Sequence, residues 1–205
     1  MRKYFLLLSI IIATTTLKAQ DMAVNVYGGY LFGDDVTLQY GYGHIDESPL
    51  LGGSLEFNMP RGVSVELSYQ YQSTSAYTSG GLTSESGDLA ISYILIEGNR
   101  YSKIKETVSA FFGGGLGMAI ITPGDNFETV GRLAWKIKAG ALITPSDKFG
   151  IKLGMQLNSC VQGIGGGLYF GTGGAGAGAT AYSSMYQFGF NGGIYFRFGK
   201  DGSSN

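Results

Sequence analysis

The chain has 205 residues, 35 of them glycine, and only 14% carry a charged side chain, against roughly 25% in an ordinary soluble domain. Its 44% apolar and 13% aromatic residues exclude a disordered chain, and its single cysteine excludes a disulfide framework. A net charge of -1 gives no electrostatic basis for nucleic-acid binding.

Residues 1–19 have the layout of a secretory signal peptide. Two basic residues precede an apolar run over residues 4–13, and Ala19 supplies a small residue at the cleavage position. The run is shorter than the about 20 apolar residues that a membrane-spanning helix needs. We therefore expect a signal peptide at 1–19 and one mature domain at 20–205, without a lipid anchor, because the only cysteine, Cys160, lies far from the cleavage position.

The rest of the chain alternates apolar and polar residues with the period of two that is typical of β-strands. The clearest segment is 63–72, where Val, Leu and Tyr at odd positions alternate with Ser, Glu and Gln at even positions. In chain order the pattern predicts eight strands, at 22–32, 50–58, 63–72, 88–97, 107–120, 132–142, 149–158 and 188–198.

The connections between these strands alternate in length. They are short at 59–62, 98–106 and 144–148, and long at 33–49, 73–87, 122–129 and 159–185. An even number of strands then places all long loops at one end and both termini at the other, which is the plan of a bacterial outer-membrane barrel with periplasmic termini. A further hairpin within 159–185, giving ten strands, stays open.

The distribution of charge decides which face of the strands points outward. The apolar faces of the eight predicted segments carry no charge, whereas a soluble barrel or sandwich needs a charged exterior. In hydrocarbon every backbone polar group must be paired, and a closed barrel achieves this. The sequence therefore predicts an all-β fold, a closed antiparallel eight-stranded transmembrane β-barrel, with its polar face toward the lumen.

The predicted inward positions supply two acids on one wall and five bases on the opposite wall. Because an unpaired buried charge is costly, we expect these side chains to meet across the axis as a polar plug. The surplus of bases leaves an alternative open, a narrow anion-preferring pore or small-ligand conduit. The predicted lumen charge network consists of Glu56, Glu66, Arg132, Lys136, Lys138, Lys152 and Arg197.

The last long connection is rich in glycine and carries no charged residue between Lys152 and Arg197. A flexible linker would explain its glycines. It would not explain the apolar cluster of Leu168, Tyr169 and Phe170, which suggests that this loop closes the barrel mouth as a lid.

Candidate catalytic and metal-binding residues give weak signals. His44 and Ser48 are close in sequence but fall in a predicted loop that does not fix their geometry, so we interpret His44 as a solvated loop residue. Cys160 has no His or Cys neighbour and is expected to be a packed thiol. We therefore predict no enzyme activity, no cofactor and no metal site.

The end of the last strand carries a specific motif. Asn191, Gly193, Phe196 and Phe198 fit the pattern polar-x-Gly-x-x-aromatic-x-aromatic, which resembles the C-terminal signal read by the barrel-assembly machinery. Together with VYGGY at 26–30 and FFGGGLG at 111–117, the layout resembles the small eight-stranded outer-membrane barrels of the OmpA, OmpX and OmpW kind, the "outer membrane beta-barrel protein" group.

This resemblance implies an integral protein of the bacterial outer membrane that contacts lipid and lipopolysaccharide. The group hosts several functions, so the resemblance does not select an activity. We expect a non-enzymatic structural or surface-interaction protein whose extracellular partner the sequence does not name, with no nucleic acid as partner. Its predicted loops offer aromatic contact residues, namely Tyr40, Tyr42, Tyr77, Tyr169 and Tyr182.

Overall fold

A computed structural model describes residues 21–38, 41–79, 84–124, 129–161 and 184–198. Within these ranges the elements are β1 (Met22–Leu31), β2 (Asp34–Leu38), β3 (Gly41–Ile45), β4 (Ser48–Met59), the 3-10 turn η1 (Pro60–Gly62), β5 (Val63–Ser79), β6 (Ser84–Lys105), β7 (Val108–Pro123), β8 (Val130–Ile143), β9 (Phe149–Val161) and β10 (Met185–Phe198). No helix among these residues is long and apolar enough to cross a membrane.

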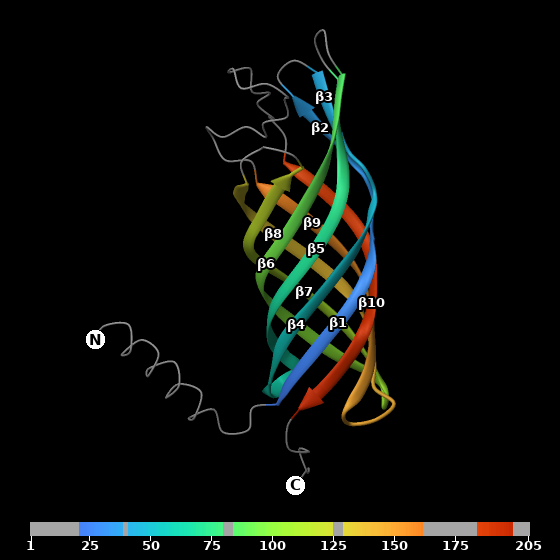
Figure 1. Cartoon of the computed structure of the whole chain (residues 1–205). Helices are drawn as coiled ribbons and strands as arrows, with labels where there is room; N and C mark the ends of the chain where they lie inside the picture. The colour runs from blue at the N-terminus through green and yellow to red at the C-terminus, as the bar shows by residue number, and fades with distance from the viewer. Residues whose placement is uncertain (1–20, 39–40, 80–83, 125–128, 162–183, 199–205) are drawn as a thin grey trace, which may run out of the picture.

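Eight of the strands form a closed antiparallel barrel (Figure 1). Around the ring the order is β1, β4, β5, β6, β7, β8, β9 and β10, and β10 pairs with β1 to close it. The eight-stranded barrel predicted from the alternation is confirmed. Closure matters physically because it leaves neither edge of the ring unpaired.

The register of the barrel is staggered by ten residues. One row of cross-strand partners starts at Met22 and returns to β1 at Phe32, whose backbone N–H donates to the Phe188 carbonyl. The row runs through Phe57, Val65, Gly98, Gly114, Ile137, Leu157 and Phe188. This stagger tilts the strands, and a tilted ring of eight strands has an interior just wide enough to be filled by side chains.

A small sheet continues beyond one rim of the barrel, and we call it the extension. It comprises β2, β3, the end of β5 from residue 73 and the start of β6 up to residue 88. β2 pairs with β3, β3 with β5, and β5 with β6 as far as Ser79 and Ser84. Figure 1 shows it standing above the barrel.

Three predicted connections are therefore wrong in detail. The loops expected at 33–49 and 73–87 contain strands, and the turn expected at 98–106 shrinks to residues 106–107 because β6 continues to Lys105. In 73–79 Ser and Thr occupy both faces, so backbone pairing extends the strand without the apolar alternation that reveals strands in a sequence.

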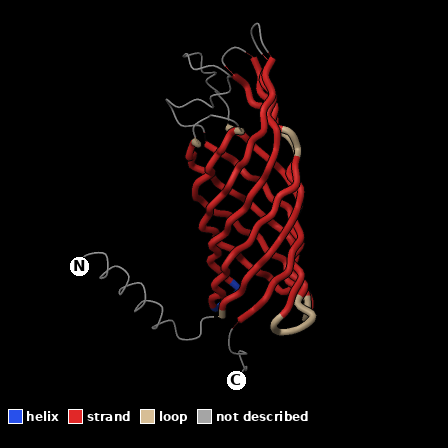
Figure 2. Tube along the Cα trace, viewed as in Figure 1, coloured by secondary structure: helices blue, strands red, loops and turns tan. Residues whose placement is uncertain are grey.

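The described chain begins and ends at the same end of the barrel, opposite the extension (Figures 1 and 2). The short connections lie at this end too. In the first, Arg61 and Gly62 have φ values of 65° and 70°, a left-handed conformation that glycine adopts without steric cost. The alternation of short and long connections thus predicted the two ends correctly.

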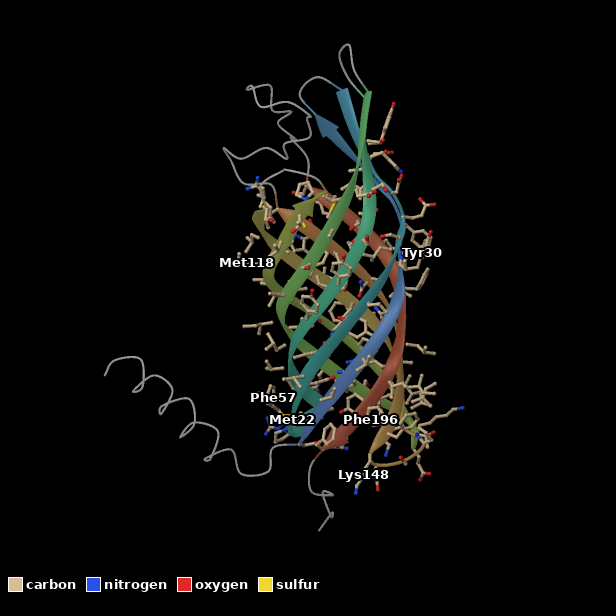
Figure 3. All side chains as sticks on the ribbon, viewed as in Figure 1. Met22, Tyr30, Phe57, Met118, Lys148 and Phe196 are labelled. Carbon is tan, nitrogen blue, oxygen red and sulfur yellow. The ribbon has the colours of Figure 1, made fainter. Side chains whose placement is uncertain are left out.

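The outer surface of the barrel is apolar. Tyr30 and Met118, labelled in Figure 3, are 44% and 54% exposed, and both project outward. Further exposed side chains on this surface are Val26, Leu51, Leu67, Ile96, Phe112, Leu116, Leu133, Ile137, Leu153, Phe188, Phe190 and Phe196. The orientation predicted from the charge distribution therefore agrees with the structure.

Gly52 on β4 provides a test of how tightly the wall and interior fit together. A Cβ at this position would lie 2.4 Å from Cζ of its cross-strand partner Tyr27. We expect Gly52→Ala to lower the free energy of unfolding by about 1–3 kcal/mol, because the Tyr27 ring must move. Urea unfolding of the refolded protein in lipid measures this value.

Gly98→Ala is the matched control, since a Cβ there meets nothing within 4 Å. It should leave stability the same or slightly higher. Equal losses for both variants would show that the Tyr27 contact has no special weight.

Candidate functional site

Three buried carboxylates lie side by side on one wall of the barrel interior. Glu56 on β4 is the cross-strand partner of Glu66 on β5, and Glu66 is the partner of Glu97 on β6. All three are at most 2% exposed. Like charges directly opposite each other destabilise a sheet, so this row needs positive charge close by.

Three lysines from the facing wall supply that charge. Lys136 Nζ lies 3.2 Å from Glu97, and Lys138 Nζ lies 2.6 Å from both Glu66 and Glu97. Lys152 Nζ lies 2.9 Å from a Glu56 oxygen and 3.5 Å from Glu66. These six residues form the ionic layer, which is electrically neutral when all six are charged.

Neutral side chains complete the hydrogen bonding of the carboxylates. Ser64 and Tyr101 hydroxyls each donate to Glu56 Oε1 at 2.5 Å, and Asn99 Nδ2 donates to Glu66 Oε2 at 2.8 Å. The Ser68 hydroxyl donates to Glu97. A buried polar network of this kind is stabilising only when its members are satisfied, so these bonds hold the layer in one arrangement.

Glycine makes room for the long side chains. Gly115 lies between Glu97 and Lys136 in the same row of partners. A Cβ on Gly115 would lie 2.6 Å from Cγ of Glu97. The absent side chain therefore leaves the space in which the carboxylate and the ammonium group meet.

The layer differs from the predicted network in three residues. Glu97 belongs to it and was missed. Arg197 instead lies at the mouth, where its guanidinium pairs with Asp21, and Arg132 lies beside apolar residues nearer the extension. The layer contains three acids and three bases, so the expected surplus of positive charge is absent from it.

Glu97 could have been found from the sequence by the rule that placed the other charges. It lies on the same face of β6 as Tyr93 and Leu95, and both of these residues are buried. Both faces of this strand are apolar, since Ile94 and Ile96 are exposed, so alternation alone did not show which face is inside. A charge on β6 still has to point inward when the outer face meets lipid.

The part of the interior nearer the extension is apolar, which we did not expect. Tyr93 and Ile91 are fully buried there, and the Cys160 thiol donates to the Tyr93 hydroxyl at 3.5 Å. This apolar layer comprises Ile45, Ala76, Leu89, Ile91, Tyr93, Leu95, Ala119, Ile121, Ala134, Cys160 and Met185. Cys160 is therefore a packed thiol.

The cavities show how completely these layers fill the lumen. A cavity of about 30 Å³ borders Glu66 and the three lysines of the ionic layer, which is space for one or two water molecules. A cavity of about 10 Å³ lies at the apolar layer. A hollow of about 340 Å³, lined partly by Tyr101 and Tyr195, opens at the end that holds the termini.

His44 lies in the extension, on β3, and not in a loop as predicted. Its Nδ1 lies 2.7 Å from Asp35 Oδ1 and its Nε2 3.6 Å from Asp46 Oδ1. The hydrogen bond to Asp35 is the main reason that the pKa of His44 is raised, and the charges of Asp46 and Glu47 add to it. Among the described residues no group of three or more His, Cys, Asp or Glu could hold a metal ion.

The remaining sequence candidates divide between described and undescribed residues. Asn191 points into the lumen and donates to Gln156 Oε1 at 2.8 Å, while Phe196 and Phe198 point outward and are 42% and 54% exposed. Gly193 faces inward against Tyr27. Outside the described residues lie the lid candidates Leu168, Tyr169 and Phe170, the loop tyrosines Tyr40 and Tyr182, and most of 159–185.

No protein-family model matches the chain, and neither does any curated protein sequence. Among solved structures it is similar to Neisserial surface protein A (NspA), with 10% identity, a TM-score of 0.60, and coverage of 86% of this chain and 97% of that one. It is also similar to the outer membrane protein OprG from Pseudomonas aeruginosa, with 12% identity, a TM-score of 0.58, and coverage of 89% and 98%. The chain has the fold of the outer-membrane β-barrels.

Glu66 is the carboxylate on which the ionic layer can best be tested, because two lysines contact it. We expect Glu66→Gln to lower the free energy of unfolding by about 3–5 kcal/mol, since it leaves buried ammonium groups short of a counter-charge. Replacing both partners, as Glu66→Leu with Lys138→Met, should recover much of that loss. Urea unfolding in lipid vesicles measures all three proteins.

The exposed turn residue Asp147 supplies the control, and Asp147→Asn should change stability by no more than about 0.5 kcal/mol. An effect of Glu66→Gln as small as this would contradict the proposed importance of the ion pairs.

His44 predicts a pH dependence that is confined to the extension. The pKa of His44 is raised in the folded state, so its contact with Asp35 stabilises the β2–β3 hairpin. This stabilisation is fully present below the pKa of the unfolded histidine, about 6.5. It is lost as the pH rises through the pKa of the folded histidine. Titrating the His44 ring by NMR should give a pKa above that of a free histidine. Asp35→Asn should lower it more than Glu47→Gln does, and the reverse order would refute the assignment.

Proposed function

We propose that this chain is an integral protein of the bacterial outer membrane with a closed lumen, and that it acts as a non-enzymatic structural or surface-interaction protein. The observation that carries this proposal is the stacking of the ionic layer and the apolar layer in one barrel. A charged solute entering from one end meets buried ion pairs, and from the other end it meets apolar side chains that provide no substitute for hydration.

The location in the outer membrane is supported by the outer surface. Its exposed apolar side chains fit acyl chains, and aromatic pairs lie near both ends of the barrel. Phe32 and Phe188 stack 6.1 Å apart on the extension side, and Phe149 and Phe196 lie 5.6 Å apart toward the other end. One similar protein is described as a surface protein and another as an outer membrane protein. We infer that the termini are periplasmic and that the extension is extracellular.

The extension is the part of the described chain best suited to meet a partner outside the cell. It presents Asp34, Asp35 and Asp88 beside a single described histidine, and Asp46 and Glu47 follow directly after β3, so this end is acidic. The ring contacts of His44 are made to Asp35 and Asp46, and the Cys160 thiol is packed against Tyr93. These arrangements give no support to nucleophilic catalysis, which requires a nucleophile within reach of its base.

Conductance tests whether the lumen is closed. In planar bilayers the refolded protein should give no discrete current steps, while a general diffusion porin in the same bilayers should give them. Deleting residues 165–179 from the last connection should leave the baseline unchanged, because the two interior layers close the lumen. Current steps from the wild-type protein would overturn the proposal that the lumen is closed. Current steps from the deletion variant alone would show that the last connection, and not the two interior layers, closes the lumen.

A further inference from the structure

Three amide side chains in the barrel interior have hydrogen-bonding groups without partners. Gln72 on β5, Asn158 on β9 and Gln187 on β10 are all 0% exposed. The side-chain nitrogen and oxygen of each have no hydrogen-bond partner among the described residues. Buried amides in native proteins are almost always bonded to protein or to ordered water, so six such atoms require an explanation.

These residues lie on the extension side of the ionic layer, at the level of the apolar layer, and we call them the amide layer. Asn158 is the cross-strand partner of both Lys136, in the ionic layer, and Gln187. Gln187 is two residues from Met185 in the apolar layer, and Gln72 is the partner of Ile91 in that layer.

The three amides converge from two sides of the barrel. Asn158 and Gln187 face the lumen from adjacent strands, and the Cβ atoms of such partners are about 4.5–5.5 Å apart. In the ring order β5 and β9 are separated by β4, β1 and β10, so Gln72 projects from the opposite wall. An eight-stranded barrel is narrow enough for side chains from opposite walls to approach the axis together.

The unpartnered atoms define the chemistry of what can bind. Each amide offers an acceptor oxygen and an NH₂ donor. A cation would engage the oxygens only and an anion the NH₂ groups only, and either would add charge above a neutral ionic layer. Water satisfies donors and acceptors together.

We propose that the amide layer binds ordered water, which bridges Asn158 and Gln187 and reaches Gln72 across the axis. The inference does not depend on the proposed surface role.

NMR of the refolded protein in lipid nanodiscs tests this site directly. In rotating-frame spectra, cross-peaks to water should appear at the side-chain NH₂ groups of Gln72, Asn158 and Gln187. The sign of these cross-peaks should indicate dipolar contact and not proton exchange. Asn99 is the matched control, since its Nδ2 donates to Glu66 Oε2 at 2.8 Å and to Ser64 Oγ at 3.2 Å. It should show no such cross-peak.

A variant tests whether the water is shared. Asn158→Leu should abolish the cross-peak at Gln187, because it removes one of the two bridged amides, while the gel mobility of the folded barrel is kept. Absence of water contact at all three amides in the wild-type protein overturns the proposal, whether or not the variant folds. Equal cross-peaks at Asn99 overturn it as well, because they would show general hydration of the lumen.

Discussion

The neutralisation of a row of carboxylates by lysines from the facing wall is the interaction on which this barrel depends. Glu56, Glu66 and Glu97 are adjacent partners and would repel one another in an isolated sheet. Their counter-charges, Lys138 among them, come from β8 and β9, so the ionic layer exists only when the ring is closed. A register slip of one residue would turn these charges toward lipid, which makes the closed register strongly preferred.

The interior is divided into zones of different polarity along the axis. Ion pairs fill the part nearer the termini, and apolar side chains such as Ile91, with the three amides at their level, fill the part nearer the extension. The ionic part holds the wall together by directional bonds, whereas the apolar part packs without them. With the closed lumen that we propose, the outer surface and the extension are the regions that can interact with other molecules.

The extension gives one end of the barrel an ordered surface. Strand pairing of β2 and β3 with β5 gives part of the first connection a fixed backbone, and His44 bonds to Asp35 across that pairing. A partner would therefore meet an ordered, acidic sheet and not only loops. Because its single described histidine is bonded to a carboxylate that raises its pKa, this sheet loses a positive charge at a higher pH than a free histidine would.

Alternation in the sequence determined the eight strands, the outward direction of the apolar faces, and the inward direction of residues such as Lys136 and Lys152. A period of two reports which face a side chain is on, but it contains no information about height along the axis. The alternation places Arg197 on the inward face of its strand, yet it lies at the mouth of the barrel, where it pairs with Asp21. Only the ten-residue stagger of the closed ring fixes which inward side chains share a level, and it brings the lysines to the three acids.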